Sequence, residues 1–403
     1  MARLGSIYLG GSEGLPDSGT ICNSGVGFGL TSPSPFTSVY LFEDGVWEIE
    51  IQKGQPTIVA RTFEVLPPDE ILDRGLEACQ KYLDLVSVAK QRHRGVKSPE
   101  EAHILLFKSG EEWVLRVISI AELSAGISAS ATLFRDEIVV SPPPKPRLKW
   151  IPAFRYYRLS RMSNDLFEAY RNLFLSFESL VYDIVPISPH ERETVWLRRA
   201  LNEIDKEIPL ADYVPTGTPV PVEYFMKMQY DTRCSLFHAK GNQCILPHAC
   251  LDLRVLSNAY EQLFQLWQRI ATRYYNTSRE PGTFTYAGFR ILMDDAFGDG
   301  FEILATDDPT PVTGSETEVS PLNHPAVQFP HLRYESKSIP GRVFLIGCLN
   351  DETLQDVGVL HRFCTKARSV IFTVNYVEEG LFPIGVDRLE CYQGIRLKNN
   401  NLP

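Results

Sequence analysis

A fixed cation and a titratable side chain stand five positions apart in the segment 231–240, which reads DTRCSLFHAK. Arg233 carries a planar guanidinium whose fork of N–H groups matches the oxygens of a phosphodiester. His238 carries an imidazole that can take or give a proton near neutral pH. The two residue types together are suited to holding a phosphodiester and moving a proton on it.

The local pattern places this pair on the last turns of a helix. Gly241 is expected to end the helix, because glycine adopts the left-handed conformation at little cost just past a helix end. Five positions on an ideal helix correspond to a rotation of about 140° and a rise of about 7.5 Å, so Arg233 and His238 do not share one face. They converge only if the helix loosens at Gly241 or if two copies of the chain face each other. The negative end of the helix dipole favours protonated His238.

The Arg-x4-His pattern near a helix end, within a region that reads as helical, resembles the signature of the HEPN superfamily. The run 233–240 is most similar to the Apea-like branch, in which an apolar pair precedes the histidine and a lysine, here Lys240, follows it. The resemblance implies a dimeric, metal-independent endoribonuclease in which the Arg and His of both protomers meet at one cleft. Such enzymes commonly serve in phage defence or toxin systems. Cys234 departs from the Asn, Asp or His that usually follows the arginine in active members, and other members keep the fold without activity.

The resemblance also implies a role for each residue of the motif. His238 is expected to act as general base or acid on the ribose 2′-hydroxyl or the leaving 5′-oxygen, and Arg233 to stabilise charge on the phosphate. Lys240 is expected to contact the RNA backbone or to interact with the helix dipole, and Asp231 to orient a basic neighbour or to be solvated. The expected substrate is single-stranded RNA, no cofactor is expected, and a homodimer would form through the helical bundle. The alternative is a catalytically inactive interaction or ligand-binding protein on the same scaffold.

A second interpretation of the same segment is a zinc site. Cys234 and His238 stand four positions apart, and Cys244 and His248 repeat that spacing ten residues later. Thiolate sulfur and imidazole nitrogen are the ligands that structural zinc sites use. Pro247 interrupts the helix that the second pair would need, and the short Cys-x2-Cys knuckle does not occur in the sequence. We carry the zinc site as the weaker alternative to the nuclease.

Helical periodicity runs through the region that carries the motif. Apolar residues recur every three or four positions from 159 to 184, which predicts one long helix. A capping box with proline at the first helical position predicts a second helix from Ser188. The motif helix is expected to begin near Pro221, and a fourth helix to span about 249–275. Helices at these positions are typical of a helical bundle.

Alternation of apolar and polar residues indicates strands on both sides of this region. Residues 1–140 are expected to form an α+β domain with an antiparallel sheet and one helix. Residues 281–403 are expected to form a β-rich domain that includes a strand at 284–293 and packs on the first domain. The Pro-rich run 141–152 is expected to be a stiff linker. The predicted fold class is therefore α+β multidomain, with a central all-α HEPN-like bundle over 153–280 flanked by two β-rich α+β domains.

Two glycine-rich runs near the start of the chain, 10–14 and 25–29, invite comparison with nucleotide-binding loops. Neither run is followed by Gly-Lys-Ser/Thr, and neither stands between a clear strand and a helix. Turns and strand bulges are therefore the expected structures.

Length and composition exclude several other classes of protein. A chain of 403 residues, 44% of them hydrophobic, is long enough for two or three domains. Met1–Ser6 leads into no apolar run of signal-peptide length, and no stretch approaches membrane-spanning length, so we expect a cytoplasmic chain with reduced cysteines and no membrane partner. The net charge of −10 argues against a general nucleic-acid coat. Residues 151–282 are electrically neutral, which makes the helical region the least repulsive for RNA. We expect the two flanking domains to hold the dimer closed or to bind an unknown activating ligand or protein.

Overall fold

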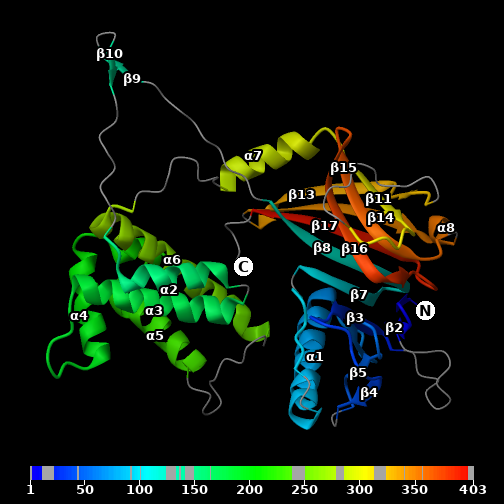
Figure 1. Cartoon of the computed structure of the whole chain (residues 1–403), viewed down its shortest axis with the longest axis horizontal. Helices are drawn as coiled ribbons and strands as arrows, with labels where there is room; N and C mark the ends of the chain where they lie inside the picture. The colour runs from blue at the N-terminus through cyan, green and yellow to red at the C-terminus, as the bar shows by residue number, and fades with distance from the viewer. Residues whose placement is uncertain are drawn as a thin grey trace. The chain divides into compact units, whose positions relative to one another are not determined.

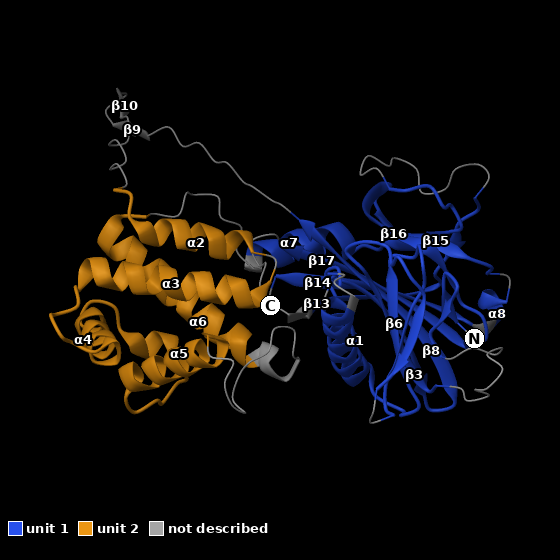
Figure 2. Cartoon of the chain, turned by 60° about the horizontal axis from the view of Figure 1, so that its bottom comes forward, with its two compact units in different colours: residues 1–125, 284–400 blue, residues 126–283, 401–403 orange. Residues whose placement is uncertain are grey.

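The chain divides into two compact units in the computed structural model. Unit 1 consists of Met1–Ala125 and Phe284–Asn400, and unit 2 consists of Gly126–Thr283 and Asn401–Pro403 (Figure 2). The structure describes residues 2–10, 22–42, 45–90, 93–99, 101–123, 133–135, 138–140, 149–163, 165–237, 250–277, 286–312, 324–339, 341–355 and 357–397. Among these residues, none of the helices is both long and apolar enough to cross a membrane.

The described part of unit 1 consists mainly of β-strands and also contains three helices. The helices are α1 (Pro68–Lys90), α7 (Tyr286–Phe297) and α8 (Asp351–Leu354). The strands are β1 (Arg3–Leu4), β2 (Ile7–Tyr8), β3 (Ser24–Gly29), β4 (Ser38–Leu41), β5 (Glu48–Ile51), β6 (Thr57–Thr62), β7 (Ala102–Ser109), β8 (Glu112–Leu123), β11 (Glu302–Thr306), β12 (Val327–Gln328), β13 (His331–Ile339), β14 (Arg342–Asn350), β15 (Leu360–Ala367), β16 (Val370–Phe382) and β17 (Arg388–Leu397).

These strands form two sheets in the described part of unit 1 (Figure 1). The larger sheet has nine strands in the order β13-β14-β17-β8-β7-β3-β6-β5-β4, and the smaller has six in the order β12-β11-β15-β16-β1-β2. One core cluster contains Val59 and Leu115 from the larger sheet together with Phe363 and Leu381 from the smaller one. The two sheets therefore bury apolar faces against each other, as in a β-sandwich.

The first and last segments of the chain are joined by strand pairing. β17 lies between β14, to which it is antiparallel, and β8, to which it is parallel from Arg388↔Val114 to Leu397↔Leu123. β1 pairs with β16 in the smaller sheet. The expectation that the C-terminal segment packs on the N-terminal one is confirmed, and the two segments also share both sheets.

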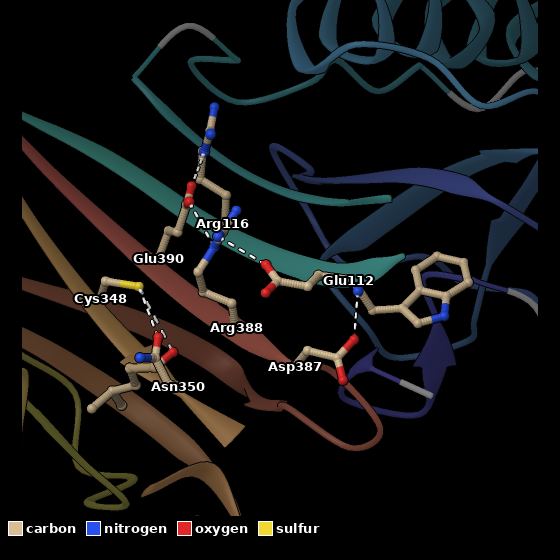
Figure 3. Close-up of polar contacts among 9 residues, drawn as sticks. Glu112, Arg116, Cys348, Asn350, Asp387, Arg388 and Glu390 are labelled. Carbon is tan, nitrogen blue, oxygen red and sulfur yellow. Dashed lines mark hydrogen bonds and ion pairs between the residues drawn. The ribbon is translucent and has the colours of Figure 1, made fainter. Parts of the chain in front are cut away.

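Charged side chains follow the β8–β17 pair along its surface (Figure 3). Nη1 of Arg388 lies 2.9 Å from Oε2 of Glu112, and Nε of Arg388 lies 3.2 Å from Oε1 of Glu390. Nε of Arg116 donates to Oε2 of Glu390 at 2.7 Å. The backbone N–H of Trp113 donates to the Asp387 carboxylate at 2.6 Å. Opposite charges from two segments that are far apart in sequence are thus paired across this junction.

The glycine-rich run 25–29 is the regular strand β3, paired with β6 and β7, and not a turn, bulge or nucleotide loop. A Cβ on Gly25 would lie 2.0 Å from the carbonyl oxygen of Leu9, so glycine is required where the N-terminal segment crosses the strand. In the run 10–14, residues 11–14 lie outside the described residues.

Unit 2 is dominated by helices: α2 (Pro152–Met162), α3 (Leu166–Ile184), α4 (Glu193–Asp205), the 3-10 turn η1 (Leu210–Tyr213), α5 (Pro221–Phe237) and α6 (Cys250–Tyr275). It also contains the antiparallel pair β9 (Leu133–Arg135) and β10 (Ile138–Val140). The helix expected over 159–184 is broken near Ser163, because the Asp165 carboxylate caps a new helix by accepting bonds from the N–H groups of Phe167 and Glu168. The helix expected from Ser188 begins only at Glu193, since His190 has a φ of 65°.

The predicted fold class, a central all-α HEPN-like bundle flanked by two β-rich α+β domains, is wrong. The chain is α+β with large antiparallel and mixed sheets, and its N- and C-terminal segments form one unit instead of two flanking domains. The helices of unit 2 share that unit with β9 and β10, and further helices lie in unit 1. The strand expected at 284–293 is the helix α7, whose Phe289, Met293 and Phe297 are buried at helical spacing. The division into separate terminal domains failed because strand pairing over long sequence distances leaves no local signal.

Candidate functional site

The predicted site residues fall partly within the part of the chain that the structure describes. Asp231, Arg233 and Cys234 lie on α5, whose start at Pro221 confirms the predicted start of the motif helix. Asp231 is exposed, whereas Arg233 and Cys234 are half-buried. His238, Lys240, Cys244 and His248 lie outside the described residues, and so does Gly241.

Arg233 is sheltered by aromatic rings and directed toward two carboxyl groups. Its guanidinium carbon lies 5.3 Å from the ring centre of Phe237, 5.9 Å from that of Tyr230 and 6.0 Å from that of Phe174. The side chain is 21% exposed, and its Nη2 lies 3.3 Å from Oε1 of Glu193. Among the described residues its buried Nε has no hydrogen-bond partner. The guanidinium therefore keeps unused donor capacity in a partly dehydrated position.

Glu178 and Glu193 form a carboxyl pair beside this arginine. Glu178 comes from α3, and Glu193 is the first residue of α4. Burial, together with the hydrogen bond and negative charge of Glu193, raises the pKa of Glu178 to about 8 against the opposing charge of Arg233. Glu178 is therefore largely protonated at neutral pH and shares a hydrogen bond with Glu193.

The same carboxyl groups set the electrostatics of Arg233. Burial alone would lower the pKa of Arg233, but the charges of Glu193 and Glu178 outweigh it and raise the pKa above its ordinary value. A hydrogen bond with Cys234 acts in the same direction. Burial, followed by the neighbouring Cys234, raises the pKa of Tyr230. The site thus presents a permanent cation, a neutral carboxylic acid and the protonated hydroxyl of Tyr230.

This arrangement is suited to binding an anion that carries several oxygens. Glu193 is 45% exposed, and its contact with Arg233 is long for a charge-assisted bond. A phosphate oxygen could replace this contact at the terminal nitrogens of Arg233, since guanidinium binds phosphate through its N–H groups. Protonated Glu178 adds no negative charge that would repel the anion.

The zinc interpretation gains nothing from the residues that the structure describes. Among them, no group of three or more His, Cys, Asp or Glu side chains is placed to hold a metal ion. Of the four proposed ligands only Cys234 is described, and it is a free thiol. A zinc site at Cys234, His238, Cys244 and His248 stays an untested alternative.

A hollow of about 230 Å³ in unit 1 is a second place where a ligand could bind. It is lined by Gly300, Phe301, Glu302, Lys366, Ala367, Arg368 and Ser369. Arg368 is already bonded to Asp295 and Asp299 near the end of α7, and Lys366 lies 4.0 Å from Glu302. Its cations are paired within the fold, so it is a weaker candidate for an anion than the Arg233 site.

Sequence reasoning missed Glu178 and Glu193. Glu178 follows the core residue Phe177 on the helix, and an acid at the margin of an apolar stripe was the only local signal. Glu193 was assigned to the interior of a predicted helix, whereas it begins α4. Their convergence on Arg233 arises from the packing of α3, α4 and α5.

Comparison of the chain with family models, with curated proteins and with solved structures finds no match in any of the three.

Proposed function

We propose that the chain is a metal-independent endoribonuclease that cleaves single-stranded RNA by attack of a ribose 2′-hydroxyl on the adjacent phosphate. The observation that carries the proposal is Arg233, a half-buried guanidinium whose one carboxylate contact among the described residues is long, at 3.3 Å. The Arg-x4-His spacing to His238, which resembles the HEPN signature, supplies the proton-transfer group.

The reaction needs one proton removed and one delivered. A base takes the proton of the 2′-hydroxyl as its oxygen bonds to phosphorus, the bond from phosphorus to the 5′-oxygen breaks, and an acid protonates that oxygen. We assign His238 to one of these transfers and Arg233 to the charge that grows on the phosphate oxygens. The products are a 2′,3′-cyclic phosphate and a 5′-hydroxyl, and DNA is excluded because it lacks the attacking group.

The proposal extends to assembly and biological role. On an ideal helix residues five positions apart do not share a face, so a homodimer that brings Arg233 of one copy to His238 of the other would complete the site. A nuclease of this kind would serve phage defence or act as a toxin, with unit 1 binding the activating ligand or protein. Lys240 and Asp231 would act at the margin of the site, Lys240 on the RNA backbone.

The test is cleavage of end-labelled single-stranded RNA by the purified full-length protein in excess EDTA. His238→Ala should lower the rate by about 10²- to 10⁴-fold, as loss of a general acid or base does. His190→Asn is the matched control, because His190 is an exposed histidine of unit 2 and asparagine tolerates its positive φ. Wild-type products should end in 2′,3′-cyclic phosphate.

Other outcomes point elsewhere. Cleavage that EDTA abolishes would favour a metal site that includes Cys234 and His238. Equal inactivity of the wild-type protein and both variants on every RNA would contradict the nuclease and favour a non-catalytic interaction protein.

A further inference from the structure

A chain of buried hydrogen bonds ties three helices of unit 2 together close to Arg233. The hydroxyl of Tyr170 on α3 lies 2.8 Å from Oε1 of Gln229 and 3.0 Å from the backbone oxygen of the same residue on α5. Nε2 of Gln229 donates to the backbone oxygen of Ala259 on α6 at 2.9 Å. Tyr170 is fully buried and Gln229 is 1% exposed. A polar chain therefore runs through an otherwise apolar core cluster.

This chain meets the helical turn that carries Arg233. In an α-helix the carbonyl of one residue accepts the N–H of the residue four positions later, so the Gln229 carbonyl is the acceptor for the backbone N–H of Arg233. The Tyr170 hydroxyl thus contacts the same carbonyl oxygen that accepts the backbone hydrogen bond of Arg233. Tyr170 also stacks on Phe174, with ring centres 6.2 Å apart, and Phe174 is one of the rings beside the Arg233 guanidinium.

Stability alone gives little reason for these polar groups. Apolar residues of similar shape in place of a buried hydrogen-bonded pair are often neutral for stability or better. Hydrogen bonds depend on orientation, so they fix the rotation of one helix against another. An error of about 1 Å in the position of a catalytic side chain can cost about 10²-fold in rate.

We propose that Tyr170 and Gln229 are positioning residues, which fix the rotation of α5 so that Arg233 is held beside Glu178 and Glu193. The inference rests on the proposed function for its consequence in catalysis, but the placement itself can be measured without RNA. Neither residue contacts substrate in this account.

The kinetic test compares Tyr170→Phe with Tyr260→Phe in the full-length protein. Each change removes one buried hydroxyl from unit 2, since Tyr260 is 3% exposed and its hydroxyl lies 3.1 Å from Oγ of Ser160. Tyr170→Phe should lower kcat by about 10- to 100-fold, whereas Tyr260→Phe should change it by less than about twofold. In an Arg233→Ala background Tyr170→Phe should cause no further loss, because the residue acts through Arg233.

The second readout is the ¹⁵N–¹H resonance of the Arg233 Nε group, assigned by its disappearance in Arg233→Ala. Tyr170→Phe and Gln229→Leu should shift this resonance, and Tyr260→Phe should leave it in place. An unchanged resonance in both site variants, or an equal change in the Tyr260 control, overturns the inference. If the wild-type protein cleaves no RNA, the proposed function fails, and the resonance still decides whether Tyr170 and Gln229 position Arg233.

Discussion

Arg61 in unit 1 and Arg233 in unit 2 are both shielded cations beside two glutamates, but their hydrogen bonds differ. Arg61 is 1% exposed, and its Nε donates to Glu48 at 2.6 Å, its Nη1 to the backbone oxygen of Tyr8 at 2.8 Å, and its Nη2 lies 2.7 Å from Glu50. Arg233 has one carboxylate contact at 3.3 Å and, among the described residues, an Nε without a partner.

The difference separates a structural cation from one that is available to a ligand. The donors of Arg61 are used inside the fold and hold the N-terminal segment on β5 and β6. Arg233 is charged and partly dehydrated, yet its one carboxylate contact among the described residues is long, which suits a group that receives an anion from outside. The predictions below test this contrast, beginning with the largest effect.

The largest effect is expected for Arg61→Ala. Removal of this cation leaves the buried Glu50 and the partly exposed Glu48 without their counter-charge, which should lower the free energy of unfolding by about 3 kcal/mol. Chemical denaturation of the full-length protein measures the loss. Arg198→Ala is the control, because Arg198 pairs with Glu223 on the surface and exposed pairs contribute about 0–1 kcal/mol. Equal losses in the two variants would contradict a structural role for Arg61.

The next effect concerns the carboxyl pair and depends on pH. The pKa of Glu178 is raised from 4.5 to about 8, so between these values the folded chain keeps a proton that the unfolded chain has lost. Folded-state stability therefore falls as pH rises through this window. Glu178→Gln removes the titration and should make the protein more stable than wild type by about 2 kcal/mol at pH 8, with a smaller difference at pH 5. Melting curves at both pH values measure this, and a pH-independent difference would contradict it.

A smaller effect is expected at the junction of the two terminal segments (Figure 3). Glu390→Gln weakens the contacts to Arg116 and Arg388, and because Glu390 is largely shielded, the loss should be about 1 kcal/mol. Arg116 keeps its places over the rings of Phe107 and Tyr392. The control is Glu203→Gln, which breaks an exposed pair with Lys206 and should change stability by less than about 0.5 kcal/mol. No loss in Glu390→Gln would show that strand pairing alone holds the junction.

Local sequence patterns predicted the elements that carry the motif. The proline at the start of α5 and the apolar repeat of α6 placed both helices within one residue of their observed starts. Patterns of this kind depend on neighbours three or four positions away, which the sequence displays directly.

Patterns of this kind do not predict contacts between segments that are far apart in the sequence. Nothing in the strand at 388–397 indicates that it lies parallel to 114–123, and the two terminal segments were therefore assigned to separate domains. Glu178 and Glu193 were missed for the same reason, since three helices must pack before these residues meet Arg233. The position of Arg233 on a helix could be predicted from the sequence, but its proximity to Glu178 and Glu193 could not.

The most direct test of the account is the rate of RNA cleavage by Arg233→Ala beside wild type in excess EDTA, with the folded fraction of each measured in the same samples. The account predicts a loss of about 10²- to 10³-fold in rate, as for removal of a transition-state donor, with little change in the folded fraction. The assignment of Arg233 to the phosphate would be contradicted if Arg233→Ala cleaved RNA at the wild-type rate. It would also be contradicted if the loss of rate only matched the loss of folded protein.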